Sequence, residues 1–177
     1  MNQFKQILLT AVATIGIFST TMISCNTDKC KSVVCANNGS CDGTTGSCVC
    51  ATGYEGTTCA TQSLSKFLGT SNTSQNYSFN DASSAGCGTY TGTMTATRST
   101  SDTTKLILTN LGGFGTSTYV KATVNGNNLS IATQTVTGST TNTISGSGVY
   151  SNGVVSGTYT NNDGITTCTY TFTWTKI

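Results

Sequence analysis

Cysteine placement constrains this chain more than any other feature of its sequence. The chain has nine cysteines in 177 residues, and six of them fall within residues 30–59, here called the cysteine module. A segment this short buries too little apolar surface to fold unaided, so cross-links must hold it together. A zinc or iron–sulfur site is the rival interpretation, but the chain has no His and no pair of CxxC spacings. We therefore expect a disulfide-bonded module whose pairing the spacing alone leaves open.

The N-terminal residues resemble a bacterial export signal. Lys5 precedes the apolar stretch 7–18, which is long enough for a signal peptide and too short to span a membrane. Met22-Ile23-Ser24-Cys25 resembles a lipobox, at which bacterial lipoproteins receive a diacylglycerol on Cys and are cut just before it. We expect a signal peptide over residues 1–24 and a lipidated tether over 25–29. An ordinary signal peptide that leaves Cys25 as a plain thiol is the alternative.

Cysteine parity supports lipidation. Assigning Cys25 to lipid leaves eight of the nine cysteines to form pairs. A single acyl chain holds a protein on a membrane only marginally, whereas two acyl chains on one residue anchor it stably. We therefore expect a palmitate-carrying lipoprotein of the bacterial envelope, at the outer membrane, and leave open whether it faces outward.

The cysteine module resembles the epidermal growth factor-like (EGF-like) family. Its cysteines are spaced C-x4-C-x5-C-x6-C-x-C-x8-C, and the run 48–59 (CVCATGYEGTTC) matches the family's C-terminal signature. Asn38-Gly39 lies where that family has an Asn-Gly turn. The resemblance implies the pairs Cys30–Cys41, Cys35–Cys48 and Cys50–Cys59. Calcium-binding members carry acidic and amide ligands before the first Cys, where Asp28 stands nearly alone, so we expect no calcium site. The module's role is either protein contact or that of a spacer, and we favour the spacer.

A polar linker over residues 60–65 precedes a second domain over 66–177, which alternates with period 2. In the run 167–175 (TCTYTFTWT), threonines alternate with apolar or aromatic residues, and the run 89–97 repeats the pattern. This alternation is typical of antiparallel strands with one wet face. We expect eight strands, over 66–74, 88–98, 103–110, 117–124, 129–137, 141–151, 154–161 and 165–176.

Turn signals predict how three pairs of these strands align. Asn152-Gly153 suits a two-residue hairpin loop. It places Tyr150 opposite Val155, Gly148 opposite Gly157 and Gly146 opposite Tyr159. Asp163-Gly164, taken as a second such loop, places Tyr159 opposite Cys168, Gly157 opposite Tyr170 and Val155 opposite Phe172. Gly126-Asn127 places Val124 opposite Leu129 and Ala122 opposite Ile131.

An eight-strand meander has exposed edges unless it closes, so we expect an all-β chain with a closed barrel and keep a β-sandwich as the alternative. The domain resembles the calycin or lipocalin-like barrels. The Gly within residues 66–70 (KFLGT) corresponds to a Gly near the start of that family's first strand. Cys87 and Cys168 are the cysteines outside the module, and in an exported chain we expect them to pair. In a closed meander the last strand reaches the start of the second, so this bond also tests closure.

Seven residues on the predicted inner face are candidates for contact with a ligand: Tyr90, Met94, Tyr150, Tyr159, Tyr170, Phe172 and Trp174. We expect them to form a packed core. Glycines on the same face, at 92, 146, 148 and 157, would instead leave room for a small molecule beside the aromatic rings.

The sequence excludes several functions. It has no His, none of the common catalytic motifs and no Gly-rich phosphate loop, so we expect no enzyme activity, no cofactor and no metal. Its net charge is +2 without a basic run, which argues against nucleic acid. We expect a membrane-anchored module that binds an extracellular protein or glycan. A lipocalin-like carrier of a small apolar ligand is the alternative.

Overall fold

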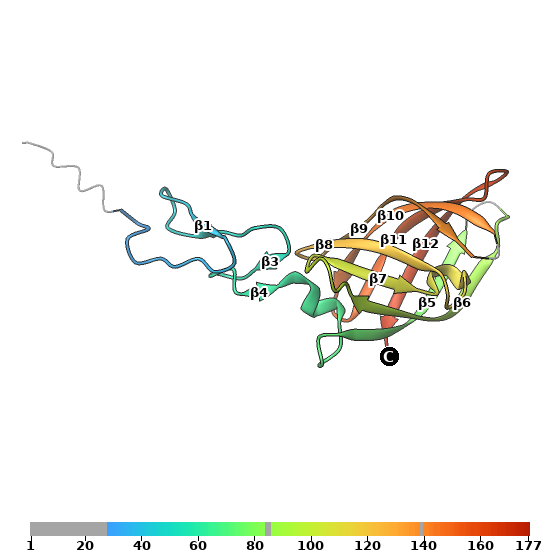
Figure 1. Ribbon diagram of the computed structural model, residues 1–177, viewed down its shortest axis with the longest axis horizontal. Helices are drawn as coiled ribbons and strands as arrows, with labels where there is room; N and C mark the ends of the chain where they lie inside the picture. Colours follow the sequence, from blue (N-terminus) through green and yellow to red (C-terminus); the bar gives the residue numbers. More distant parts are fainter. Residues whose placement is uncertain (1–27, 84–85, 139) are drawn as a thin grey trace, which may run out of the picture.

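The computed structural model describes residues 28–83, 86–138 and 140–177. The expected signal peptide (1–24) and lipidation site Cys25 lie outside the described residues. Figure 1 shows an elongated molecule in which the cysteine module projects from one end of a β-barrel. Strands occupy most of the ordered structure, and its helices are two short 3₁₀ turns within the described part of the chain.

Eight antiparallel strands form a closed barrel in the order β10-β11-β12-β5-β6-β7-β8-β9. The last strand closes it by pairing with the first, from Tyr170↔Ser83 to Lys176↔Tyr77. The expected closed barrel is confirmed, the β-sandwich is excluded, and the architecture is compatible with a calycin-like fold. The barrel strands are β5 (Ser74–Ser83), β6 (Thr89–Arg98), β7 (Lys105–Thr109), β8 (Tyr119–Asn125), β9 (Asn128–Thr137), β10 (Thr141–Ser151), β11 (Val154–Asn162) and β12 (Thr167–Lys176).

The prediction of the first barrel strand over 66–74 was wrong. A 3₁₀ helix, η1 (Ser63–Phe67), and a turn occupy most of that range, and β5 begins only at Ser74. Leu64, Phe67 and Leu68 are buried, and their spacing places them on one face of a helical turn rather than on alternate faces of a strand. The Tyr77 hydroxyl donates to the Phe67 carbonyl at 2.7 Å. The segment therefore closes one end of the barrel instead of lengthening its wall.

Two of the three predicted hairpin alignments agree with the structure. Around Asn152-Gly153, all three predicted pairs are found. Around Gly126-Asn127, Val124 pairs with Leu129, as predicted.

The alignment predicted from Asp163-Gly164 was wrong by two residues. Tyr159 pairs with Tyr170, and the loop spans four residues, 163–166. The reason is local, because Asp163 Oδ1 accepts hydrogen bonds from the amides of Ile165 and Thr166 at 2.9 and 2.7 Å. A carboxylate that binds two following amides favours this wider turn over a two-residue loop. A shift of two leaves each side chain on its predicted face.

Aromatic side chains fill the barrel interior. Phe172 and Trp174 stack with ring centroids 4.0 Å apart, and Tyr159 stacks on Tyr170 at 5.0 Å. The inward glycines leave no free room beside them: a Cβ at Gly148 or Gly157 would lie 2.7 or 2.9 Å from Phe172 Cζ. These glycines admit the Phe172 ring, so the centre of the barrel is a packed core.

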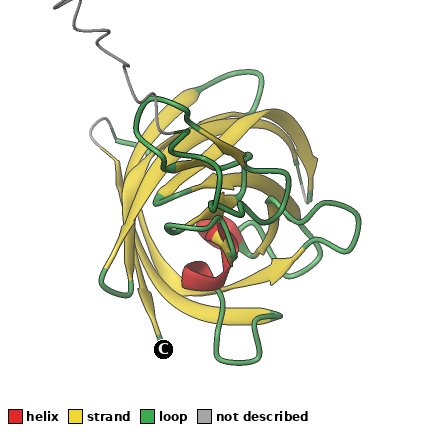
Figure 2. Cartoon of the chain, turned by 90° about the vertical axis from the view of Figure 1, so that its left-hand side faces the viewer, coloured by secondary structure: helices red, strands yellow, loops and turns green. Residues whose placement is uncertain are grey.

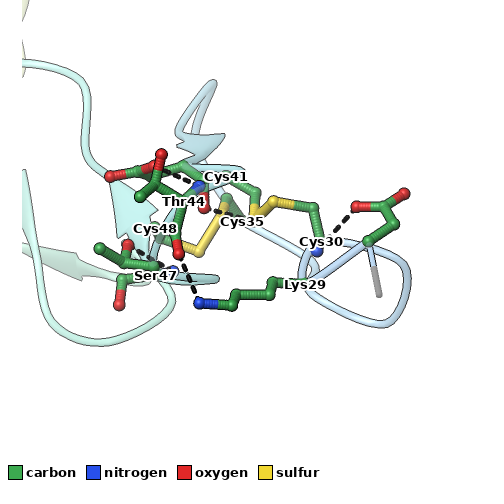
Figure 3. Close-up of a disulfide and its surroundings, with 10 residues drawn as sticks. Lys29, Cys30, Cys35, Cys41, Thr44, Ser47 and Cys48 are labelled. Carbon is green, nitrogen blue, oxygen red and sulfur yellow. Dashed lines mark hydrogen bonds between the residues drawn. A yellow bond between two sulfur atoms is a disulfide. The ribbon is translucent and has the colours of Figure 1, made fainter. Parts of the chain in front are cut away.

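Three disulfides hold the cysteine module together: Cys30–Cys41, Cys35–Cys48 and Cys50–Cys59. They are the pairs that the sequence resemblance implies. Figure 3 shows the first two side by side, with Lys29 Nζ donating to the Thr44 carbonyl at 2.6 Å. The module's strands have two residues each: β1 (Ser40–Cys41), β2 (Cys48–Val49) and β3 (Tyr54–Glu55). Because the module has so little regular structure, its disulfides stabilise it in place of a hydrophobic core.

The expected linker over 60–65 is ordered structure. Strand β4 (Thr61–Gln62) pairs with β3 of the module, and η1 follows directly. Figure 2 looks along the barrel from the module's side, with a short helix lying within the ring of strands. Lys66 Nζ links the cysteine module to the barrel, because it lies 2.7 Å from Glu55 Oε1 of the module and 2.6 Å from Asn127 Oδ1 of the barrel. The module is thus docked on the closed end of the barrel.

Candidate binding site at the distal end of the barrel

A cavity lies at the end of the barrel opposite the cysteine module, here called the distal end. The described residues of the connections from β5 to β6, β7 to β8, β9 to β10 and β11 to β12 lie at this end. The cavity has a volume of about 180 Å³ and is lined by aromatic and uncharged polar side chains, together with Val136 and three glycines. Its aromatic and asparagine side chains are Tyr90, Phe114, Asn142, Tyr159, Asn161 and Tyr170.

The connection between β7 and β8 covers the cavity. It contains the 3₁₀ turn η2 (Leu111–Gly113) and starts at Asn110, whose φ is 61°. The Asn110 side chain fixes the connection at two points, donating to the Thr93 carbonyl at 2.8 Å and accepting from the Gly115 amide at 2.9 Å. Gly112 passes directly over Tyr159, where a Cβ would lie 2.5 Å from the hydroxyl oxygen. Glycine is therefore required for this cover to close on the barrel.

Three tyrosines form one wall of the cavity. Tyr170 contacts both of the others: its ring centroid lies 5.0 Å from that of Tyr159 and 5.8 Å from that of Tyr90. The Tyr170 hydroxyl donates to the Cys87 carbonyl at 3.2 Å. Cys87 in turn is bonded to Cys168, with Cα atoms 5.9 Å apart. The disulfide expected from the sequence thus supports the rim of the cavity.

Asp81 lies behind this wall, inside the barrel, and is fully buried. The Tyr159 hydroxyl donates to its Oδ2 at 2.8 Å. Burial raises the pKa of Asp81 to about 6, and hydrogen bonding from Tyr159 and Trp174 partly offsets the rise. Even so, Asp81 Oδ1 and Trp174 Nε1 have no partner of ordinary hydrogen-bond geometry within the described residues. Burial and the nearby Asp81 charge raise the pKa of Tyr159, so its hydroxyl keeps its proton.

Sequence reasoning missed Asp81. The predicted strands over 66–74 and 88–98 leave Asp81 in the connection between them, because the first barrel strand is predicted too early in the chain. The signal was present, since Tyr77, Phe79 and Asp81 alternate with Asn76, Ser78 and Asn80. In the structure these three share the inward face of β5.

Two asparagines complete the polar part of the lining. Asn142 is buried, and its amide nitrogen donates to Thr140 Oγ1 at 2.9 Å. Asn161, on the inward face of β11, has a buried Oδ1 without a hydrogen-bond partner among the described residues. A buried acceptor of this kind costs free energy until a donor reaches it.

The structure divides the seven candidate residues among three places. Tyr90, Tyr159 and Tyr170 line the cavity. Met94, Phe172 and Trp174 are buried in the packed core. Tyr150 lies toward the closed end, where its ring is 5.2 Å from that of Phe67. The inner face is thus not one binding surface.

Comparisons with known proteins add no family to this architecture: neither protein-family models nor curated proteins gave a match. Within residues 28–83, 86–138 and 140–177, no helix has the length and apolar character to cross a bilayer. In the same part of the chain, no group of three or more His, Cys, Asp or Glu side chains is placed to hold a metal ion.

Proposed function

We propose that this protein is a lipid-anchored lipoprotein of the bacterial envelope that binds an extracellular protein or glycan through the distal end of its barrel. The sequence supports the anchor through the lipobox-like run ending at Cys25 and through cysteine parity. The EGF-like spacing and the three module disulfides support an extracellular, oxidising location.

The observation that carries the proposal is the position of the cavity. The cysteine module docks at one end of the barrel through Lys66 and Glu55, and the cavity opens at the other end. A chain anchored before the module would therefore present the cavity away from the membrane. In this arrangement the EGF-like module acts as a rigid spacer, and the barrel makes the contact.

Carriage of a small apolar ligand has less support. Phe172 and Trp174 occupy the space in which a lipocalin-like carrier would hold its cargo. The distal cavity is small, and its polar lining suits an apolar molecule poorly. We expect no catalysis either. Tyr159 is the lining hydroxyl that is paired with a carboxylate among the described residues, and its raised pKa keeps it protonated.

The test uses cells that produce either the wild-type protein or Cys25→Ala. We expect radioactive palmitate to label the wild type and not Cys25→Ala. Wild-type cells should adhere to at least one surface in a panel coated with glycans or extracellular matrix proteins, and Cys25→Ala cells should lose that adhesion. Equal labelling of the two proteins would refute the anchor. Labelling without any difference in adhesion would refute the binding role.

A further inference from the structure

We propose that the distal cavity binds a single neutral sugar ring, such as the terminal hexose of a glycan. This inference deepens the proposed function and rests on it for the ligand being extracellular. The size of the cavity is the first argument. Pockets for drug-sized ligands span about 300–1,000 Å³. A cavity of about 180 Å³ therefore holds one small ring and excludes a lipid chain or a folded peptide.

The charge of the lining is the second argument. No Lys, Arg, Asp or Glu side chain lines the cavity within the described part of the chain. Asp81 is fully buried behind Tyr159 and is already bonded to its hydroxyl. A charged ligand would lose its hydration here without gaining an opposite charge, which is costly. The lining therefore favours a neutral ligand over a uronic acid, a phosphorylated sugar or an amine.

The direction of the hydrogen bonds is the third argument. Two hydroxyl donors of the lining are already used: Tyr159 donates to Asp81, and Thr118 Oγ1 donates to the Phe114 carbonyl at 2.9 Å. The acceptor Oδ1 of Asn161 is buried and unused. The lining thus holds an acceptor that lacks a donor, so the matching ligand must bring a donor of its own. A polyol does this through its hydroxyl groups.

The exposed tyrosine is the fourth argument. Tyr90 is 45% exposed, although it lies on the inward face of β6 beside Tyr170. A large ring left open at the mouth of a polar cavity provides an apolar surface for the C–H face of a sugar. Tyr119, which is 60% exposed at the same end of the barrel, does not line the cavity. The two tyrosines therefore form a matched pair for a test.

The experiment titrates the full chain, purified in a sugar-free detergent with its disulfides intact, against glucose, galactose, mannose and N-acetylglucosamine. Saturation-transfer NMR reports binding. We expect saturable binding of at least one of these sugars in the millimolar range. Tyr90→Ala and Asn161→Ala should each weaken it at least tenfold, and Tyr119→Ala should leave it unchanged. Glucuronic acid, glucosamine and hexanoic acid should bind at least tenfold more weakly than the best neutral sugar.

Several outcomes would overturn the inference. The first is the absence of saturable binding for all four neutral sugars. The second is a charged sugar or hexanoic acid that binds as tightly as the best neutral sugar. The third is binding that neither Tyr90→Ala nor Asn161→Ala weakens. Such a failure is separable from failure of the proposed function. Adhesion that depends on Cys25 but resists competition by all four sugars would retain the surface-binding role and reject the sugar site.

Discussion

Asp81 is the residue whose chemistry departs most from its surroundings. It is a fully buried carboxyl group with one oxygen bonded to Tyr159, and its other oxygen has no partner of ordinary hydrogen-bond geometry among the described residues. Burial raises its pKa to about 6, above the ordinary aspartate pKa of 3.8 that applies to the unfolded chain. The folded state therefore holds this proton more tightly than the unfolded state does. Stability must fall as the pH rises from about 4 through 6, and the loss is complete above that range.

The substitution Asp81→Asn tests this dependence. It removes the buried charge and keeps an acceptor for Tyr159. We expect it to raise the free energy of unfolding by about 1–2 kcal/mol at pH 8 and to give no such gain at pH 4. Urea titrations followed by fluorescence of Trp174, the one tryptophan of the chain, measure both values.

The control is Asp102→Asn, which should act in the opposite direction. Hydrogen bonds from Thr104 lower the pKa of the partly exposed Asp102 to about 2, so its contribution to stability is present at pH 8 and lost as the pH falls. A gain from Asp81→Asn that is the same at pH 4 and pH 8 would contradict the assigned titration.

The disulfide between Cys87 and Cys168 is the cross-link that matters most at the scale of the elements. It joins the connection between β5 and β6 to the start of β12, across 81 residues of sequence. β12 already pairs with β5 to close the barrel, so the bond fixes the closing seam at its distal end. It also fixes the Cys87 carbonyl that accepts from Tyr170.

Replacing both cysteines (Cys87→Ser with Cys168→Ser) should destabilise the barrel. A loop of this length corresponds to about 4 kcal/mol on the chain-entropy estimate, and we expect a measured loss of about 2–4 kcal/mol in the free energy of unfolding. Denaturation followed by Trp174 fluorescence measures it. Peptide mapping without reductant should find the three module disulfides intact. A module bond rearranged in the variant, or unchanged barrel stability, would contradict the assigned role of the seam.

The whole molecule is a single elongated unit because the module is docked and not merely tethered. The β3–β4 pair, the Lys66–Glu55 ion pair and the bond from the Gly126 amide to Ser63 Oγ at 3.1 Å all cross the junction. Gly53 packs against the barrel without room for a side chain, since a Cβ there would lie 2.5 Å from Thr104 Cγ2. The junction is small, and its fit depends on this contact.

The substitution Gly53→Val should therefore release the module from the barrel. It adds bulk against Thr104 at a position whose φ of +88° also disfavours a branched side chain. Amide relaxation by NMR should give one rotational correlation time for the wild-type module and barrel, and a shorter one for residues 30–59 in the variant. Gly43→Val is the matched control, because nothing lies within 4 Å of a Cβ at Gly43. Two correlation times in the wild type would refute the docking.

Local sequence signals predicted the elements that depend on neighbouring residues. Alternation located most barrel strands to within two residues of their observed ends, and Asn152-Gly153 gave the correct alignment of β10 with β11. The prediction for β11 with β12 was wrong because period 2 cannot distinguish shifts of two residues, which leave every side chain on the same face. The choice there depended on how Asp163 bonds to its own loop.

The sequence by itself determined the all-β class and the division of the cysteines into six and two, because alternation and spacing report directly on strand geometry. It predicted the closed barrel with a β-sandwich as the alternative, and it predicted the partner of Cys87 because Cys168 is the other cysteine outside the module. Only the tertiary structure decided that η1 closes one end of the barrel, that Asp81 faces inward, and that a polar cavity remains at the other end. Each of these depends on side chains far apart in the chain: Phe67 with Tyr77 and Tyr150, Asp81 with Tyr159, and Gly112 with Tyr159. Such contacts arise only after the sheet has closed and brought strand ends together, so no local pattern encodes them.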